Sequence, residues 1–168
     1  MTGDQKIKLS EHTGKVVLKD GSTMLFRPIK QSDAQAWMFF YRKLSEHADC
    51  LRLQRVPRDL NYEDALRYCT IDYYNQFALV AEIIESRQRH IVAVGRYTRL
   101  PDPKIADISF VVLDSYQNKG IGAKLIEWLA TVAGKSGIDP DGGLGMHHEA
   151  YRETGRRSKP SRDVTPSG

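Results

Sequence analysis

The stretch IADISFVVLDSYQNKGIG, residues 105–122, carries the strongest structural signal in this sequence. Residues 105–113 are rich in β-branched and aromatic side chains, which favours a strand. From the end of the glycine-rich residues 117–122 onward, apolar side chains recur at helical spacing at Ile121, Leu125, Trp128, Leu129 and Val132. The stretch therefore predicts a strand, a tight turn and an amphipathic helix that packs on a sheet.

The turn at residues 117–122 is suited to a bulky anion. Glycine lets the backbone approach a ligand closely, the first amides of a helix have no partner within it, and the helix dipole favours negative charge. Residues 117–122 are therefore a candidate pyrophosphate site. Similar turns also serve purely structural roles, so the hexapeptide by itself leaves both interpretations open.

The strands before this stretch predict a mainly antiparallel sheet. Asp20-Gly21 lies between strand-like residues 16–19 and 22–26, a pattern typical of a hairpin with a tight primed turn. Residues 77–84 and 91–97 are further strand candidates. The link between them is too short for a parallel crossover, which predicts an antiparallel pair.

Two helices are predicted between the hairpin and the later strands. Ser32–Gln35 reads as a capping box that starts a helix ending near Leu44. Asn61 is expected to cap a second helix, which presents one apolar face made of Ala65, Leu66 and Cys69.

Composition excludes several classes of protein. With 168 residues, 40% hydrophobic and 27% charged, the chain suits one globular domain. No apolar run approaches the roughly 18 residues that cross a bilayer, so we expect a cytoplasmic protein without a membrane partner. The net charge of +4 is not gathered into a basic block, and no nucleic-acid partner is predicted. Cys50 and Cys69 lack CxxC partners, and no metal site is predicted.

Several separate pieces of the sequence resemble the GNAT acyltransferase superfamily, whose coenzyme A signature is Q/R-x-x-G-x-G/A. The likeness is greatest to the GNAT domain of bacterial protein-lysine acetyltransferases. It rests on D-G-x-x-x-x-x-R-P-I at residues 20–29, I-D-Y at 71–73, A-L-V-A-E at 78–82, V-G-R-Y at 94–97 and the segment 106–122. The resemblance implies an α+β fold of the α/β sandwich type, with a mixed, mainly antiparallel sheet flanked by helices.

The resemblance also implies roles for individual residues. Asp107 stands where the family has a glutamate that acts as general base, and it is one methylene shorter. A lysine amine with a pKa of about 10.4 must lose a proton before it attacks a thioester. A carboxylate can act as the general base that accepts this proton. A solvent-facing aspartate is the alternative, and Glu82 and Tyr116 are minor candidates. Backbone amides would hold the thioester and pantetheine of acetyl-CoA at Val111, Val112 and Leu113, and its pyrophosphate at Gln117, Asn118, Lys119, Gly120, Ile121 and Gly122.

The sequence departs from the family after Gly137, where a further strand, helix and strands are expected. We predict an N-terminal extension at residues 1–14, an incomplete acyl-CoA-binding domain at 15–138 and a polar, disordered tail at 139–168. The sheet would be truncated after the signature helix, and its unpaired edge offers a contact to a second copy of the chain.

Two functions fit this reading of the sequence. The first is an acetyl-CoA-dependent N-acetyltransferase that modifies an amine, with a protein lysine as candidate acceptor. The alternative is a truncated, non-catalytic GNAT domain that only binds acyl-CoA or a protein partner.

Overall fold

The computed structural model describes residues 8–44 and 60–145, which form a six-stranded sheet in the order β1-β2-β3-β4-β5-β6. The first five strands pair antiparallel, and β6 is parallel to β5. The strands are β1 (Gly14–Val17), β2 (Thr23–Pro28), β3 (Gln76–Glu85), β4 (Gln88–Arg99), β5 (Ala106–Val112) and β6 (Leu144–Gly145). The helices are α1 (Ala34–Leu44), α3 (Tyr62–Cys69) and α4 (Ile121–Lys135), with short 3-10 turns η1 (Leu9–His12), η2 (Gln31–Asp33) and η3 (Asp114–Tyr116).

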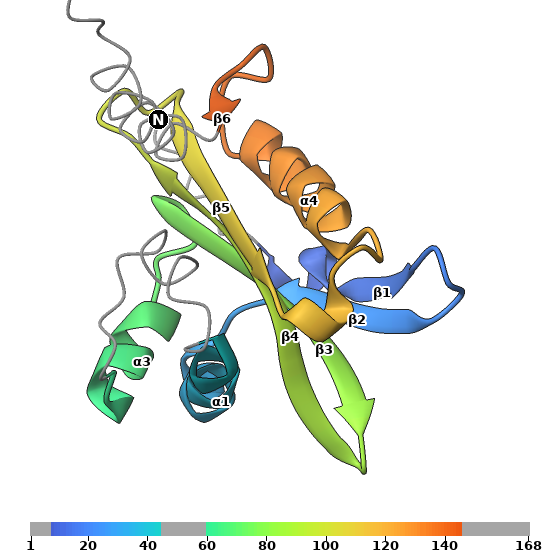
Figure 1. Ribbon diagram of the computed structural model, residues 1–168. Coiled ribbons are helices and arrows are strands. Elements are labelled where there is room, and N and C mark those ends of the chain that lie inside the picture. Colours follow the sequence, from blue (N-terminus) through green and yellow to red (C-terminus); the bar gives the residue numbers. More distant parts are fainter. Residues whose placement is uncertain (1–7, 45–59, 146–168) are drawn as a thin grey trace, which may run out of the picture.

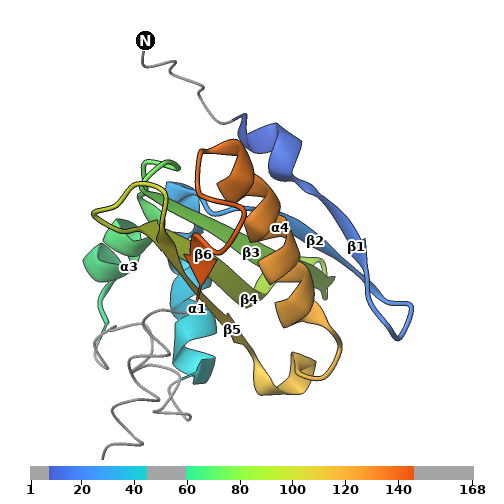
Figure 2. The same cartoon turned by 90° about the horizontal axis from the view of Figure 1, so that it is seen from above.

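The helices lie on both faces of this sheet, which confirms the α+β class. Helices α1 and α3 cover one face, and α4 lies across the other (Figure 1). Seen from above, α4 crosses the middle of the sheet, where it contacts β3, β4 and β5 (Figure 2). None of the described helices is long and apolar enough to span a membrane.

Helix α4 buries the apolar face that its sequence predicts. The fully buried side chains are Ile121, Leu125, Leu129 and Val132, each contributing roughly 1.5–3 kcal/mol. Trp128 is partly exposed, and its ring meets that of Phe26 edge to face at 5.3 Å. Gly95 on β4 gives the helix room, because a Cβ there would lie 2.9 Å from Leu129 Cδ1. The helix therefore lies closer to the sheet than a larger residue would allow.

The β1–β2 hairpin forms as predicted, but its turn is wider than the predicted primed turn. The last pair is Val17 with Thr23, and the Leu18 N–H donates to the Ser22 carbonyl at 2.8 Å. Within this loop only Gly21 has a positive φ, at 83°, whereas a type I′ turn needs two such residues. The Asp20 carboxylate accepts from the Ser22 N–H at 2.9 Å, which stabilises a three-residue loop instead.

The primed turn lies instead between β3 and β4. Glu85 pairs with Gln88, and the two residues between them, Ser86 and Arg87, have φ values of 51° and 63°. Both strands are longer than their apolar runs, because polar residues continue the ladder beyond the core. The strands predicted from hydrophobicity alone, residues 77–84 and 91–97, are therefore too short.

Asn61 caps α3 as predicted, with its side chain accepting from the Asp64 N–H at 2.8 Å. The start of α1 differs from the capping box expected at Ser32–Gln35. There the carboxylate of Asp33 accepts from the Lys30 N–H at 2.7 Å. Cys69 is a buried free thiol, as predicted, whereas Cys50 lies outside the described residues.

The segment after α4 corrects the expectation of a sheet that stops at β5. Ile138 is buried, and the Ala106 N–H donates to the Gly143 carbonyl at 2.8 Å, which starts the two-residue strand β6. A Cβ at Gly143 would lie 2.3 Å from the Lys104 carbonyl oxygen, so the close approach requires glycine. Leu144 packs against the core, but the strand has only two residues and depends on backbone pairing with β5, so the pattern of hydrophobic residues does not reveal it. The rest of the expected tail, residues 146–168, lies outside the described part.

A buried ion cluster joins β2, β3 and the start of α1. Arg27 donates to both Asp33 carboxylate oxygens at 2.8 Å, and its Nη2 lies 2.6 Å from Glu82 Oε2. The three side chains are only 10%, 9% and 4% exposed. Burial acts to lower the pKa of Arg27, but the hydrogen bonds with Asp33 and Glu82 outweigh it and raise that pKa above its ordinary value. The R-P-I piece of the sequence thus anchors the sheet to α1.

Replacing Arg27 by methionine should lower the free energy of unfolding by about 3–5 kcal/mol. The buried Asp33 carboxylate loses its ion-pair partner, and Glu82 keeps only the exposed Arg89, whose Nη1 lies 3.6 Å from Glu82 Oε1. Urea titration followed by circular dichroism measures the change. Arg67→Met is the matched control, since Arg67 pairs with Asp64 at 2.7 Å but its side chain is 78% exposed. The control should cost no more than about 1 kcal/mol. Equal losses in the two variants would contradict this account of the cluster.

Candidate functional site

The outer edge of β5 presents unpaired backbone groups. The Leu113 N–H donates to the Val92 carbonyl at 2.9 Å, whereas the Ala106 N–H turns the other way, to Gly143 at 2.8 Å. Because backbone groups alternate in direction along a strand, the N–H and C=O groups that face outward are those of Ala106, Ile108, Phe110 and Val112. Within the described ranges, β6 covers this edge at Ala106 and Asp107 only.

This alternation separates the three residues expected to hold the thioester and pantetheine. The Val112 amide faces the open edge. Leu113 is already bonded to Val92, and Val111 lies opposite Val94 in the ladder, so both amides are used within the sheet. The expectation that all three amides are available is therefore corrected to Val112, and the same alternation adds Phe110 and Ile108.

A cavity of about 380 Å³ lies between this edge and the start of α4. Of the residues expected to bind acetyl-CoA, all except Leu113 and Lys119 line this cavity, and Tyr116 lines it too. The full lining consists of Phe110, Val111, Val112, Tyr116, Gln117, Asn118, Gly120, Ile121 and Gly122. The strand edge and the glycine-rich turn thus belong to one concave site.

The turn aims the start of α4 at this cavity. Gly120 is the N-cap residue with φ 85°, and Asn118 also has a positive φ of 63°. The first intrahelical bond of α4 runs from the Lys124 N–H to the Gly120 carbonyl at 3.1 Å, so the preceding amides have no helical partner. The Gln117 side chain donates to the Val112 carbonyl at 3.2 Å, which ties the turn to the end of β5.

Gly122 sets the distance between α4 and β5. A Cβ at this position would lie 2.9 Å from Phe110 Cε2, closer than real Cβ contacts. A larger residue would displace either the Phe110 ring or the helix start. The second glycine of the signature therefore has a packing reason as well as a binding one.

Asp107 lies on the other face of β5, toward α1 and α3. It stands opposite Thr98 on β4 and Gly145 on β6. The residue is partly buried, and its Oδ1 atom is fully buried without a hydrogen-bond partner among the described residues. A solvent-facing aspartate is thus not what the structure shows. An unsatisfied buried oxygen costs about 1–3 kcal/mol, which marks this carboxylate as a candidate for function.

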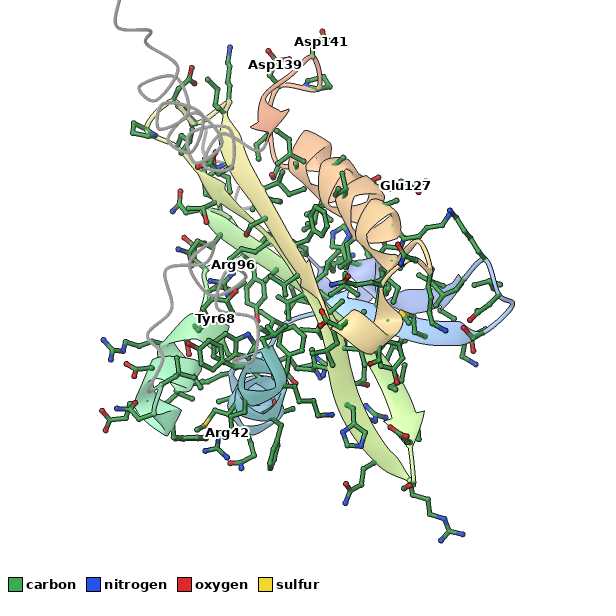
Figure 3. The ribbon with its side chains drawn as sticks, in the orientation of Figure 1. Arg42, Tyr68, Arg96, Glu127, Asp139 and Asp141 are labelled. Atoms are coloured by element: carbon green, nitrogen blue, oxygen red, sulfur yellow. The ribbon has the colours of Figure 1, made fainter. Side chains whose placement is uncertain are left out.

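Arg96 on β4 shares that face with Asp107. Its guanidinium lies 3.6 Å from the centre of the Tyr68 ring and donates to the Tyr68 carbonyl at 2.5 Å. Figure 3 shows Arg96 and Tyr68 together between the sheet and α3. Arg96 stands opposite Ser109, one side-chain row along from Asp107. The sequence matched Arg96 only as part of V-G-R-Y, and no signal in it indicated this position beside the carboxylate.

Glu82 is not brought to Asp107. Asp107 shares a row with Thr98 and Gln76, whereas Glu82 pairs with Ile91 further along the sheet. Glu82 is also buried and bound by Arg27, so it does not face outward.

The described residues contain no group of three or more His, Cys, Asp or Glu side chains placed to hold a metal ion. Burial, with a smaller effect of Asp33, raises the pKa of the Cys69 thiol to about 12. This thiol therefore stays protonated at neutral pH and is not a nucleophile.

The fold agrees with that of known proteins. A curated acetyltransferase of Pseudomonas aeruginosa is 26% identical over 121 residues, which are 72% of this chain and 65% of the relative. The chain thus spans slightly less than two thirds of that relative's length. The crystal structure of the GNAT domain of S. lividans PAT is 28% identical, with a TM-score of 0.67 over 77% of this chain and 76% of that one.

A more distant structure supports the fold alone. It is an acetyltransferase of the GNAT family from Streptococcus pneumoniae, 23% identical with a TM-score of 0.53 over 68% of this chain and 70% of that one. The family model of the acetyltransferase (GNAT) family matches residues 42–140, a range that includes α3, β3, β4, β5 and α4. With more than half of its length matched, and with an open strand edge beside a glycine-rich helix start, the chain belongs to the GNAT acetyltransferase family.

Proposed function

We propose that this chain binds acetyl-CoA and transfers its acetyl group to an amine, with a protein lysine as the acceptor. The observation that carries the proposal is the single cavity shared by the open edge of β5 and the amides that start α4. A lysine acceptor is supported by the likeness of residues 15–138 to bacterial protein-lysine acetyltransferases.

The chain offers a separate element for each part of the donor. Residues 117–122 present helix-start amides to a pyrophosphate. The outward N–H groups of Phe110 and Val112 and the Phe110 carbonyl suit the amide-containing pantetheine arm, while the Val112 carbonyl already accepts from Gln117. When bound, acetyl-CoA supplies the thioester whose carbonyl the amine attacks. Backbone donors fixed by a sheet would need no reorientation to stabilise the thioester oxygen as it gains negative charge.

Asp107 is our candidate for the group that takes the proton from the incoming ammonium. Its buried Oδ1 has no other partner among the described residues, so the carboxylate is available for this work. Arg96 supplies positive charge on the same face and is held in place by Tyr68. Aspartate reaches one methylene less far than the family's glutamate, and Asp107→Glu should therefore keep the role.

A binding-only protein is the second candidate function. Its support is the short β6, which in the described part leaves the β5 edge uncovered from Ile108 onward. A protein of this kind would retain the donor site and lack turnover. The two candidates therefore agree on binding and differ in the rate of acetyl transfer.

Placing a glutamate at the start of α4 tests the donor site. Ala123 is exposed in the first turn, where a negative side chain should stabilise the helix by about 0.3–1 kcal/mol. The same charge should repel the donor's phosphates. We expect Ala123→Glu to weaken binding of coenzyme A at least about ten-fold, or about 1.4 kcal/mol, by calorimetry.

Ala130→Glu is the matched control, since it adds the same charge at an exposed position two turns further along α4. It should leave the affinity within about two-fold, because the helix-start effect is confined to the first turn. Unchanged affinity in Ala123→Glu, in a protein that melts no lower than the wild type, would rule out this site.

Replacing Asp107 by asparagine tests the chemical step. We expect the rate of acetylation of a lysine peptide to fall by about 10²–10⁴-fold, the usual contribution of a general base, while acetyl-CoA affinity changes little. Because asparagine removes the charge of a buried carboxylate whose Oδ1 has no partner among the described residues, the free energy of unfolding should not fall.

Asp107→Glu should recover a measurable part of the rate and its dependence on pH. A pH–rate profile that is identical in wild type and Asp107→Asn would remove Asp107 from the mechanism. Coenzyme A binding without any acetylation in the wild type would favour the binding-only candidate.

A further inference from the structure

Lys119 belongs to the signature turn but does not line the cavity. Its ammonium lies 2.9 Å from the Asp20 carboxylate, in the turn that joins β1 to β2. Both views of the ribbon place this turn on the same side of the molecule as the loop before α4 (Figures 1 and 2). The Lys119 ammonium is thus paired with the Asp20 carboxylate, while the neighbouring residues Asn118 and Gly120 line the cavity.

The hairpin tip packs against the turn through a second residue. The aliphatic stem of Lys19 covers Gly120, where a Cβ would lie 3.4 Å from Lys19 Cε. Asp20 is itself held by Ser22, whose N–H and hydroxyl donate to it at 2.9 and 2.5 Å. The hydrogen bonds from Ser22 and from Lys119 place the pKa of Asp20 well below its usual range, so it is charged at neutral pH.

We propose that Asp20 is an internal competitor for the phosphates of the donor: it holds Lys119 away from the cavity, and a bound phosphate takes the ammonium over. This inference rests on the proposed function, because it assigns a regulatory contact to that same site. Lys119 then forms a charge-assisted hydrogen bond with the phosphate in place of its bond with Asp20. The affinity for the donor is lower than the site could provide, and donor binding releases the hairpin tip.

The ion pair is exposed enough for such an exchange. The Lys119 and Asp20 side chains are 35% and 43% exposed, and they lie 99 positions apart in the sequence. Exposed pairs are readily broken and are screened by salt. A phosphate can therefore displace the carboxylate without unfolding any part of the sheet.

Calorimetry with coenzyme A on four forms of the full chain tests the exchange: wild type, Asp20→Asn, Lys119→Met and the double variant. We expect Asp20→Asn to lower Kd by about two- to five-fold, or about 0.4–1 kcal/mol, and Lys119→Met to raise it. In the Lys119→Met background, Asp20→Asn should have a clearly smaller effect, because the competition acts through that ammonium.

Asp102→Asn is the matched control. It also removes one exposed carboxylate, at the turn between β4 and β5, the opposite end of β5 from the signature turn. Its Kd should equal that of the wild type. Dephospho-coenzyme A identifies the phosphate involved: loss of the Asp20→Asn effect assigns the 3′-phosphate, and its persistence assigns the pyrophosphate.

Two failures can be told apart. If the wild type binds coenzyme A and Asp20→Asn binds it equally or more weakly, the competitor role is overturned and the proposed function stands. An Asp20→Asn effect of the same size with and without Lys119 overturns it too, since simple charge removal then explains the gain. If neither the wild type nor any variant binds, the proposed function fails and this inference falls with it.

Discussion

The pairing register of β4 with β5 decides what the rest of the site can do. It turns the amides of even-numbered residues from Ala106 to Val112 toward the open edge, and it turns the odd-numbered side chains toward α1 and α3. The backbone groups proposed to bind the donor and the carboxylate of Asp107 therefore lie on one strand but point in different directions. A slip of one residue would bury the free amides and move Asp107 to the face that α4 covers.

Two close approaches keep α4 at the distance that this register needs. Gly95 admits Leu129 to the sheet, and Gly122 admits the helix start to Phe110. The sequence suggested Gly122 for its ligand chemistry, whereas the structure shows that it is also required for packing. A substitution at Gly122 would therefore change both the affinity for the donor and the stability of the protein. A charge added at exposed Ala123 tests the affinity with less effect on packing.

Sequence patterns could predict what depends on neighbouring residues. The signature turn, the apolar face of α4, the Asn61 cap and the strands from β3 to β5 all follow from local spacing. The parts that were missed depend on contacts between distant residues or on backbone alone. Lys119 meets Asp20 across 99 positions, and β6 rests on backbone pairing made possible by Gly143. No local pattern contains either contact.

The carboxylates on the α1 and α3 face of the sheet fall into two kinds. Among the described residues, some are ion-paired and stabilise the fold, and one is unpaired and is the candidate for catalysis. Asp33 and Glu82 are buried and both bind Arg27, and Glu82 also pairs with Arg89, so their charge is balanced and they stabilise the fold. Asp107 is partly buried, and its Oδ1 has no partner in the described part of the chain. Arg96 lies one row away, but its guanidinium is held by Tyr68 rather than by the carboxylate. An arrangement that served stability alone would have paired the two charges. Trp37 Nε1 and Arg96 Nε are also buried without a partner among the described residues, so it is the position of Asp107 on β5, beside the candidate donor site, that makes this acceptor the proposed base.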